Sequence, residues 1–339
     1  MTALISGTTE AQGPSPAIAK GARRRFAWRR LFAAVSLLFL LLVIAAAAYG
    51  YRPDVSGATL EKRYATSHSE FTTVQGMRVH YVDQGQGSPL VLVHGSNSSL
   101  YDWEGWIDAL SRHHRVVAMD LPGHGLTGPD PKERYRYVDQ ARFVAAFTRK
   151  LGIRHFNVAG NSMGGSVAWH LALLHPQRVD RLILLDSIGL PREEPRPLMF
   201  RAFEWPVIDR LLTVFTPDSS VRMALRDIYG DPGLVTEDQV ERTWMLTRRE
   251  GNRDAARVRL QQQGDSDVYA SRLDEIDQPT LIQWGAEDDW VLPKYGQRMD
   301  DLIPNSQLVI YPGLGHLPMT EAPLVTARDA AAFLASSGG

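Results

Sequence analysis

Short apolar runs alternate with longer stretches of helical period through most of this 339-residue chain, and this alternation limits the possible folds more than any other feature. Eight of the runs are predicted strands: 71–74, 77–82, 90–93, 116–119, 156–159, 182–185, 280–284 and 308–311. The predicted helices between them are 101–112, 137–151, 163–175, 294–302 and 322–335. Runs with no polar face are typical of strands that are buried on both sides. The pattern therefore predicts an α/β fold in which helices cover both faces of a mostly parallel, eight-stranded sheet.

One stretch interrupts the alternation. Between Leu190 and Pro279 no run has the pattern of a strand, and the stretch opens with prolines at 191, 195 and 197. The apolar segment Leu198–Phe215 and several arginine-rich helical patterns follow. We therefore expect residues 191–275 to form a helical insertion. Residues 69–190 and 276–339 would then form the α/β core.

The N-terminal part of the chain is first basic and then apolar. Residues 1–50 hold six basic residues and one acidic residue, a net charge of +5, and Leu31–Tyr49 is a run of 19 residues without charge. A helix of that length spans about 28 Å, close to the hydrocarbon thickness of a membrane. The sequence predicts a disordered basic tail over 1–30, a transmembrane signal-anchor helix over 31–50 and a linker over 51–68.

Two other interpretations of the apolar run remain open. A signal peptide cut near Ala45–Ala48, where small residues cluster, would give a secreted protein. A buried core helix fits less well, because the run has no polar face. The basic residues before the run favour a cytoplasmic N-terminus. We therefore expect a single-pass protein of the inner membrane whose remaining residues lie on the periplasmic, extracytoplasmic side.

Composition excludes several kinds of site. The chain has no cysteine, which rules out disulfide bonds, iron–sulfur clusters, cysteine-ligated zinc and a cysteine nucleophile. Its net charge of −1 gives no indication of nucleic-acid binding.

The segment Gly160–Gly165 carries the clearest chemical signal. It contains Gly-x-Ser-x-Gly around Ser162, between the strand predicted at 156–159 and the helix that follows. A turn this sharp needs small residues beside the serine, and it holds the hydroxyl at the carboxyl edge of the sheet. The helix N-terminus beneath the serine offers free N–H groups to an anion. Ser162 is therefore the predicted nucleophile.

A serine hydroxyl needs a base, and the base needs an acid to orient it. His316 follows the last predicted strand in a glycine-rich loop at the same sheet edge, and it is the predicted base. His94 ends a buried strand and is expected to order its loop by hydrogen bonds. The acid is expected in the loop Glu287–Asp289, and Asp186 is the alternative. The chain order serine, acid, histidine is that of one group of hydrolases.

These motifs together resemble the α/β-hydrolase fold over residues 69–333. The matching segments are Val91–Ser96, Asp120–Gly125, Gly160–Gly165, Trp284–Asp288 and Pro312–Met319. The resemblance implies a catalytic triad whose acid stands three residues after Gly285, at Asp288. Asp289 stays open as the acid, since Pro293 has the family's spacing from Asp289 rather than from Asp288.

The resemblance also implies an oxyanion hole and a cap. The oxyanion donors would be the backbone N–H groups of Met163, which follows the nucleophile, and of Ser96. The helical insertion 191–275 would correspond to the cap that roofs the pocket and selects the substrate. No metal and no organic cofactor is expected.

The nucleophile and its neighbours narrow the reaction class. Relatives that open epoxides or displace halides use Asp where this chain has Ser162, so both activities are disfavoured. The segment around Ser162 resembles that of carbon–carbon bond hydrolases of aromatic degradation. Those enzymes usually place an aromatic residue after the catalytic histidine, whereas this chain has Leu317. A membrane-tethered hydrolase with an apolar cap also resembles the membrane-anchored monoacylglycerol lipases of this fold.

We therefore expect a serine hydrolase of esterase or lipase type that prefers an apolar acyl group. Phe203 and Trp205 are expected to line the acyl pocket, although the apolar segment around them also fits simple packing of the cap on the core. The partners would be a small ester or lipid substrate and the membrane. Two alternatives remain: a carbon–carbon bond hydrolase, and a ligand-binding receptor on the same fold.

Overall fold

The computed structural model describes residues 16–195, 201, 205, 207–262 and 266–336. The chain divides into two compact units, Met1–Tyr51 and Arg52–Gly339, which are described separately.

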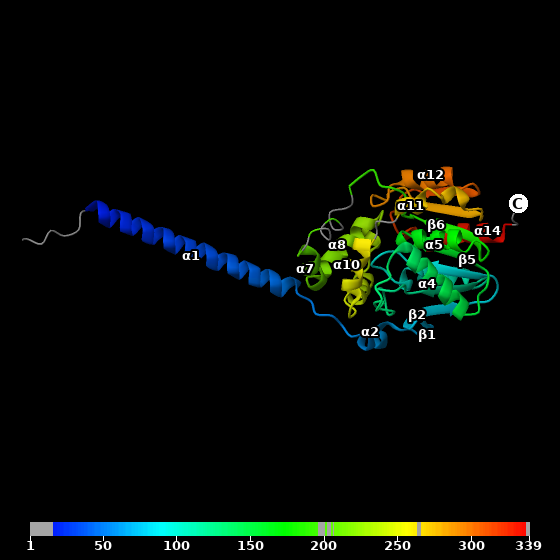
Figure 1. The fold of residues 1–339 in the computed structure, drawn as a ribbon, viewed down its shortest axis with the longest axis horizontal. Helices are drawn as coiled ribbons and strands as arrows, with labels where there is room; N and C mark the ends of the chain where they lie inside the picture. Colours follow the sequence, from blue (N-terminus) through cyan, green and yellow to red (C-terminus); the bar gives the residue numbers. More distant parts are fainter. Residues whose placement is uncertain (1–15, 196–200, 202–204, 206, 263–265, 337–339) are drawn as a thin grey trace, which may run out of the picture. The chain divides into compact units, whose positions relative to one another are not determined.

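The second unit is built on one eight-stranded sheet (Figure 1). Its strands are β1 (Ser69–Val74), β2 (Met77–Gln84), β3 (Pro89–Val93), β4 (Arg115–Met119), β5 (Phe156–Asn161), β6 (Val179–Leu185), β7 (Thr280–Gly285) and β8 (Ser306–Tyr311). Their order is β1-β2-β4-β3-β5-β6-β7-β8, with β2 antiparallel to both its neighbours and the remaining pairs parallel. All eight predicted strands are confirmed. The chain reverses its direction across the sheet around β3, and ligands of open α/β sheets bind at such a point.

Helices cover both faces of the sheet. Side chains of α4 (Tyr137–Lys150), α5 (Met163–Leu174) and α12 (Pro293–Leu302) share one hydrophobic core. Side chains of α3 (Glu104–Leu110) and α14 (Pro323–Ala335) belong to the other. Successive residues of β3 alternate between the two cores, because neighbouring side chains of a strand point to opposite faces. A 3₁₀ turn, Leu100–Trp103, precedes α3, and the short helix α13 (Pro318–Glu321) precedes α14.

The insertion between β6 and β7 contains helices and no strand in the part of it that the structure describes. Its helices are α7 (Ile208–Val214), α8 (Asp218–Ile228), α9 (Glu237–Thr247), α10 (Asn252–Gln262) and α11 (Ser266–Ala270), with 3₁₀ turns at Pro232–Leu234 and Leu273–Glu275. We refer to residues 191–275 as the cap segment, and the domain boundaries given to it above stay a prediction.

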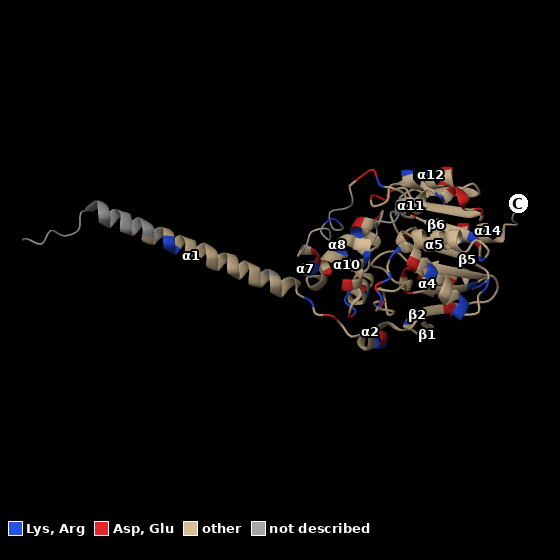
Figure 2. Cartoon of the chain, viewed as in Figure 1, with Lys and Arg blue, Asp and Glu red and all other residues tan. Residues whose placement is uncertain are grey.

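In the first unit the described residues form one helix, α1 (Pro16–Gly50). Within it Trp28–Gly50 has the length and apolar composition of a membrane span, which signal sequences near an N-terminus share. Figure 2 shows that this part is almost free of charged residues. Of the disordered tail predicted over 1–30, residues 1–15 lie outside the described residues, and residues 16–30 are helical in the structure. Proline is favoured at the first helical position, and the Ala, Lys and Arg that follow are good helix formers.

The predicted linker 51–68 also contains structure. Helix α2 (Gly57–Tyr64) begins after Ser56, whose hydroxyl accepts a hydrogen bond from the Thr59 amide. Leu60 of this helix is fully buried in the core. A capping serine and one apolar anchor explain this helix, which the polar character of the stretch concealed.

Candidate active site

The turn after β5 holds Ser162 in a backbone conformation that few residues adopt. Its φ of 53° and ψ of −116° lie outside the ordinary helical and extended regions. A Cβ atom on Gly160 would come within 2.2 Å of the Gly164 carbonyl oxygen, and one on Gly164 within 2.1 Å of the Val93 carbonyl oxygen. Both glycines are therefore required for the close approach of α5 to the sheet. The strained turn presents the Ser162 hydroxyl at the carboxyl edge of the sheet.

His316 and Asp288 meet at the same edge. His316 Nδ1 lies 2.7 Å from Asp288 Oδ2, and both side chains are buried. The other carboxylate oxygen, Asp288 Oδ1, accepts hydrogen bonds from the amides of Trp290 at 2.8 Å and Val291 at 2.9 Å. Asp289, the alternative acid, is exposed to solvent. The geometry favours Asp288 as the group that orients His316.

Asp186 lies beside this pair without orienting the imidazole. Its Oδ1 accepts a hydrogen bond from the Gly285 amide at 2.9 Å. Burial, and then the neighbouring Asp288 charge, raise the pKa of Asp186 well above its usual range. The folded environment therefore favours the protonated form of Asp186. Its carboxyl, that of Asp288 and the His316 ring place potential ligand atoms within 4.8 Å of one another, but the bond from His316 to Asp288 already uses one ligand atom of each.

The two expected oxyanion donors flank the nucleophile. Met163 is the first residue of α5, so its N–H has no partner within the helix. The loop that bears Ser96 lies directly against the nucleophile, since a Cβ atom on Gly95 would sit 3.3 Å from Ser162 Cβ. Ser96 and Ser162 line the same cavity. The placement fits the predicted oxyanion hole.

His94 orders this loop, as expected. Its Nε2 accepts the Leu121 amide at 3.0 Å, so its Nδ1 carries the proton and donates to the Gly95 carbonyl at 2.7 Å. Burial lowers the pKa of His94, which keeps the ring neutral. His94 is thereby separate from the proton chemistry of His316.

Arg259 of α10 is a site residue that sequence reasoning missed. Its Nη2 donates to Ser96 Oγ at 3.0 Å and to Asn97 Oδ1 at 2.7 Å, and the side chain is fully buried. Burial lowers the pKa of Arg259 to about 10, so the group remains cationic at neutral pH. Asn97 has a positive φ of 57°, and the guanidinium holds this loop from the cap side. No local motif distinguishes Arg259 from the other cap arginines.

Asn161, just before the nucleophile, is a second missed residue. Its Nδ2 donates to the His316 carbonyl at 2.9 Å and to the Leu185 carbonyl at 3.2 Å. One side chain thus fixes the loop of the base relative to the turn of the nucleophile. The sequence signal that could have identified this residue is its position inside the Gly-x-Ser-x-Gly motif, directly before the serine.

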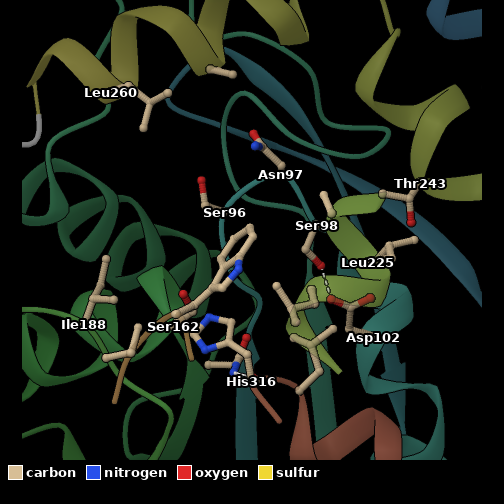
Figure 3. A pocket seen from close by; sticks show the side chains of 18 of the residues that line it. Ser96, Asn97, Ser98, Asp102, Ser162, Ile188, Leu225, Thr243, Leu260 and His316 are labelled. Carbon is tan, nitrogen blue, oxygen red and sulfur yellow. Dashed lines mark hydrogen bonds between the residues drawn. The ribbon is translucent and has the colours of Figure 1, made fainter. Parts of the chain in front are cut away.

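A cavity of about 730 Å³ opens above Ser162 and His316 (Figure 3). Its lining is mostly apolar, and much of it comes from the cap segment: Leu212, Phe215, Val221, Ala224, Leu225, Ile228 and Leu260. Asp102 is a polar exception that the sequence did not single out, and it accepts a hydrogen bond from Ser98 (Figure 3). Burial raises the pKa of Asp102 to about 6, and the Ser98 bond opposes this shift.

The structure does not confirm the two residues that were expected to line the acyl pocket. Phe203 lies outside the described residues. Trp205 exposes 60% of its surface and is not among the residues that line the cavity. The apolar stretch that contains both does contribute Leu212 and Phe215 to the lining.

Comparison with known proteins agrees with this architecture. A family model described as alpha/beta hydrolase fold matches residues 88–323. A 2-hydroxy-6-oxononadienedioate/2-hydroxy-6-oxononatrienedioate hydrolase of Burkholderia vietnamiensis is 30% identical, over 71% of this chain and 85% of that protein. A 2-hydroxy-6-oxo-6-(2'-aminophenyl)hexa-2,4-dienoic acid hydrolase of Metapseudomonas resinovorans is 27% identical, over 81% of this chain and 93% of that protein. Among solved structures, a bacterial membrane phospholipase A is 26% identical with a TM-score of 0.67, over 90% of this chain and 98% of that one.

Proposed function

Because this chain belongs to the α/β-hydrolase family, we propose that it is a serine hydrolase with Ser162 as nucleophile, His316 as base and Asp288 as orienting acid. The single observation that carries the proposal is the 2.7 Å contact of His316 Nδ1 with the doubly anchored Asp288, in a loop that Asn161 ties to the nucleophile's turn.

The mechanism follows from the roles of these atoms. With Nδ1–H donated to Asp288, His316 Nε2 is free to take the proton of Ser162 as its oxygen attacks a carbonyl carbon. Asp288 stabilises the imidazolium that results. The N–H groups of Met163 and Ser96 stabilise the developing oxyanion, and each such donor is worth about 10²–10³ in rate. Water then uses the same base to release the product.

The curated relatives favour carbon–carbon bond hydrolysis over the ester hydrolysis expected from the sequence, so it is the first candidate reaction. In that reaction water adds OH to a ketone carbon, the bond to the neighbouring carbon breaks, and that carbon takes the remaining proton. The substrates named for these relatives are acids, which need a cation in the pocket. Arg192 lines the cavity, and its Nε has no hydrogen-bond partner in the part of the chain that the structure describes. It is the proposed carboxylate ligand.

Hydrolysis of esters with an apolar acyl group is the second candidate. The specific observation that favours it is the extent of the match to the membrane phospholipase A. That match covers 90% of this chain, whereas Arg52–Gly339 is 288 of 339 residues, or 85%. The similarity therefore includes part of the N-terminal unit. Leu317, an apolar residue of the cavity wall directly after His316, is a further departure from the carbon–carbon hydrolase pattern.

One assay separates the two reactions. The purified full chain is given 2-hydroxy-6-oxo-6-phenylhexa-2,4-dienoate, and turnover is measured as the loss of the absorbance of this substrate. In parallel, the chain is given 4-nitrophenyl esters of increasing acyl length. Turnover of the dienoate alone supports the first candidate, and turnover that rises with acyl length supports the second. Ser162→Ala should abolish either activity. A reaction that survives in this variant would refute the proposed nucleophile.

A further inference from the structure

Helix α7 of the cap segment exposes an apolar surface in the part of the chain that the structure describes. We define the α7 face as Val207, Ile208, Leu211 and Val214, which expose 67%, 37%, 53% and 40% of their surfaces. Val207, which precedes the helix, Leu211 and Val214 follow one another at a spacing of three to four residues and so lie along one side, with Ile208 next to Val207. Contiguous apolar surface on a folded protein marks an interaction site.

The opposite side of α7 belongs to the catalytic cavity. Leu212 lines the cavity, and Phe215 and Thr216, directly after the helix, line it too. Asp209 is buried on the inner side and accepts a hydrogen bond from Gln261 of α10. Helix α7 thus separates the cavity from the α7 face.

The backbone that follows the candidate membrane span is hydrogen-bonded to the end of α7. The amide of Arg52 donates to the carbonyl of Val214, the last residue of α7, at 3.0 Å. The Arg52 carbonyl accepts from Arg253 Nη2 at 2.8 Å, and the Pro53 carbonyl accepts from Arg248 Nη2 at 2.9 Å. Both arginines belong to the cap segment. Arg248 Nε also donates to the Pro53 carbonyl at 3.2 Å, and these hydrogen bonds together hold residues 52 and 53 to the cap segment.

Chain length then limits how far α7 can lie from a bilayer. The candidate span Trp28–Gly50 ends two residues before Arg52. Two residues reach about 7 Å at most. If the span is inserted, Arg52 lies near the membrane surface whatever the orientation of the two units. Val214 is hydrogen-bonded to Arg52 and therefore lies near that surface too. Arg210, an exposed cation on α7, suits the anionic head groups found at such a surface.

We propose that the α7 face docks on the lipid bilayer and that apolar substrates reach the catalytic cavity from the bilayer, past Leu212 and Phe215. The proposal rests on the serine chemistry proposed above and on Trp28–Gly50 remaining as a membrane span. It deepens the second candidate function, because it names a membrane-dissolved lipid ester as the substrate class.

Fluorescent labelling tests the docking independently of activity. The chain has no cysteine, so Leu211→Cys introduces a single thiol that an environment-sensitive dye can label. Leu324→Cys on α14, an exposed leucine of the core, is the matched control. Full-length protein is reconstituted into vesicles that contain nitroxide-labelled lipids. We expect quenching of the label at 211 and none at 324.

Two results would overturn the docking. An unquenched label at 211, in protein that sediments with the vesicles, would show that α7 stays in water. A label shielded from water but not quenched by the lipids would mean that a second protein copy covers the face. Protein that loses its span and leaves the vesicles would also refute the proposal.

An activity measurement separates this proposal from the proposed function. Leu211→Asp with Val214→Asp changes the α7 face without touching a residue that lines the cavity. We expect hydrolysis of a long-chain glyceride in the vesicles to fall about tenfold or more, while a water-soluble short-chain nitrophenyl ester is hydrolysed as before. Equal loss of both activities would contradict substrate delivery through the α7 face. If the wild type hydrolyses no ester, the ester candidate and the delivery step fail, and the labelling result still decides the docking.

Discussion

Asp288 owes its place in the site to two backbone amides. The sequence offers three neighbouring carboxylates at 287–289, and their spacing alone leaves the acid open. In the folded loop the amides of Trp290 and Val291 hold one oxygen of Asp288 and turn the other toward His316. The path of the backbone therefore favours Asp288 where residue types left the acid open.

The first prediction compares the two adjacent acids. Asp288→Asn should lower kcat by about 10⁴, because the amide favours the wrong tautomer of the histidine, as in other triads. Asp289→Asn should leave kcat nearly unchanged, since that side chain is exposed. Steady-state kinetics on both variants check this. A large loss at Asp289 with little at Asp288 would contradict the assignment.

The second prediction concerns the buried Asp186. Because its pKa is raised in the folded state, folding favours its protonated form, and this stability is lost as pH rises from about 4 toward the folded-state pKa. Asp186→Asn keeps the shape and removes the titration. The variant should retain its activity, and its melting temperature relative to wild type should rise with pH. Melting curves between pH 5 and pH 9 measure this. Loss of kcat as large as that of Asp288→Asn would instead make Asp186 the orienting acid.

At the scale of elements, α10 of the cap and the loop after β3 are joined through Arg259. The strands and core helices were predictable, because each carries its own apolar period. The bond from Arg259 to Ser96 spans 163 residues, and nothing local in the sequence records it. The lining of the cavity was also beyond prediction. It depends on which side of α7 faces inward, and the apolar segment Leu198–Phe215 gave no indication of that side.

The third prediction tests that connection. Arg259→Met should lower kcat by about 10²-fold, the effect of losing an oxyanion donor, with a smaller change in KM. Arg259→Lys should recover part of the loss, because it restores a cation. Arg248→Met is the matched control, a buried cap arginine that bonds the Pro53 carbonyl and not the loop that bears Ser96. If both methionine variants lose activity equally, Arg259 only stabilises the cap.

On the scale of the whole molecule, the sequence indicated both units and the order of the core elements. The predicted N-terminal helix began too late, at residue 31, because a basic stretch before an apolar run resembles a disordered tail. The structure extends α1 back to Pro16. The length and apolar composition of Trp28–Gly50 fit a membrane span or a signal sequence. The side of the membrane on which Arg52–Gly339 lies is a prediction from charge alone.

The fourth prediction concerns that topology. The basic residues before the span should keep the N-terminus in the cytoplasm and place Arg52–Gly339 outside it. Protease added to spheroplasts of a Gram-negative host should digest the hydrolase unit while it is membrane-bound. A unit protected until lysis would reverse the orientation. A soluble product that begins near Tyr49 would identify a cleaved signal.

The bond from Asn161 to the His316 carbonyl has a consequence for biosynthesis. A growing chain contains its nucleophile long before the ribosome reaches the base. Until β8 and the loop after it have joined the sheet, Ser162 has neither a proton acceptor nor a fixed partner for its turn. With the proposed triad, an unfinished or still translocating polypeptide would therefore be catalytically silent. If the hydrolase unit is exported, this order of folding would keep the proposed activity out of the cytoplasm without any separate inhibitor.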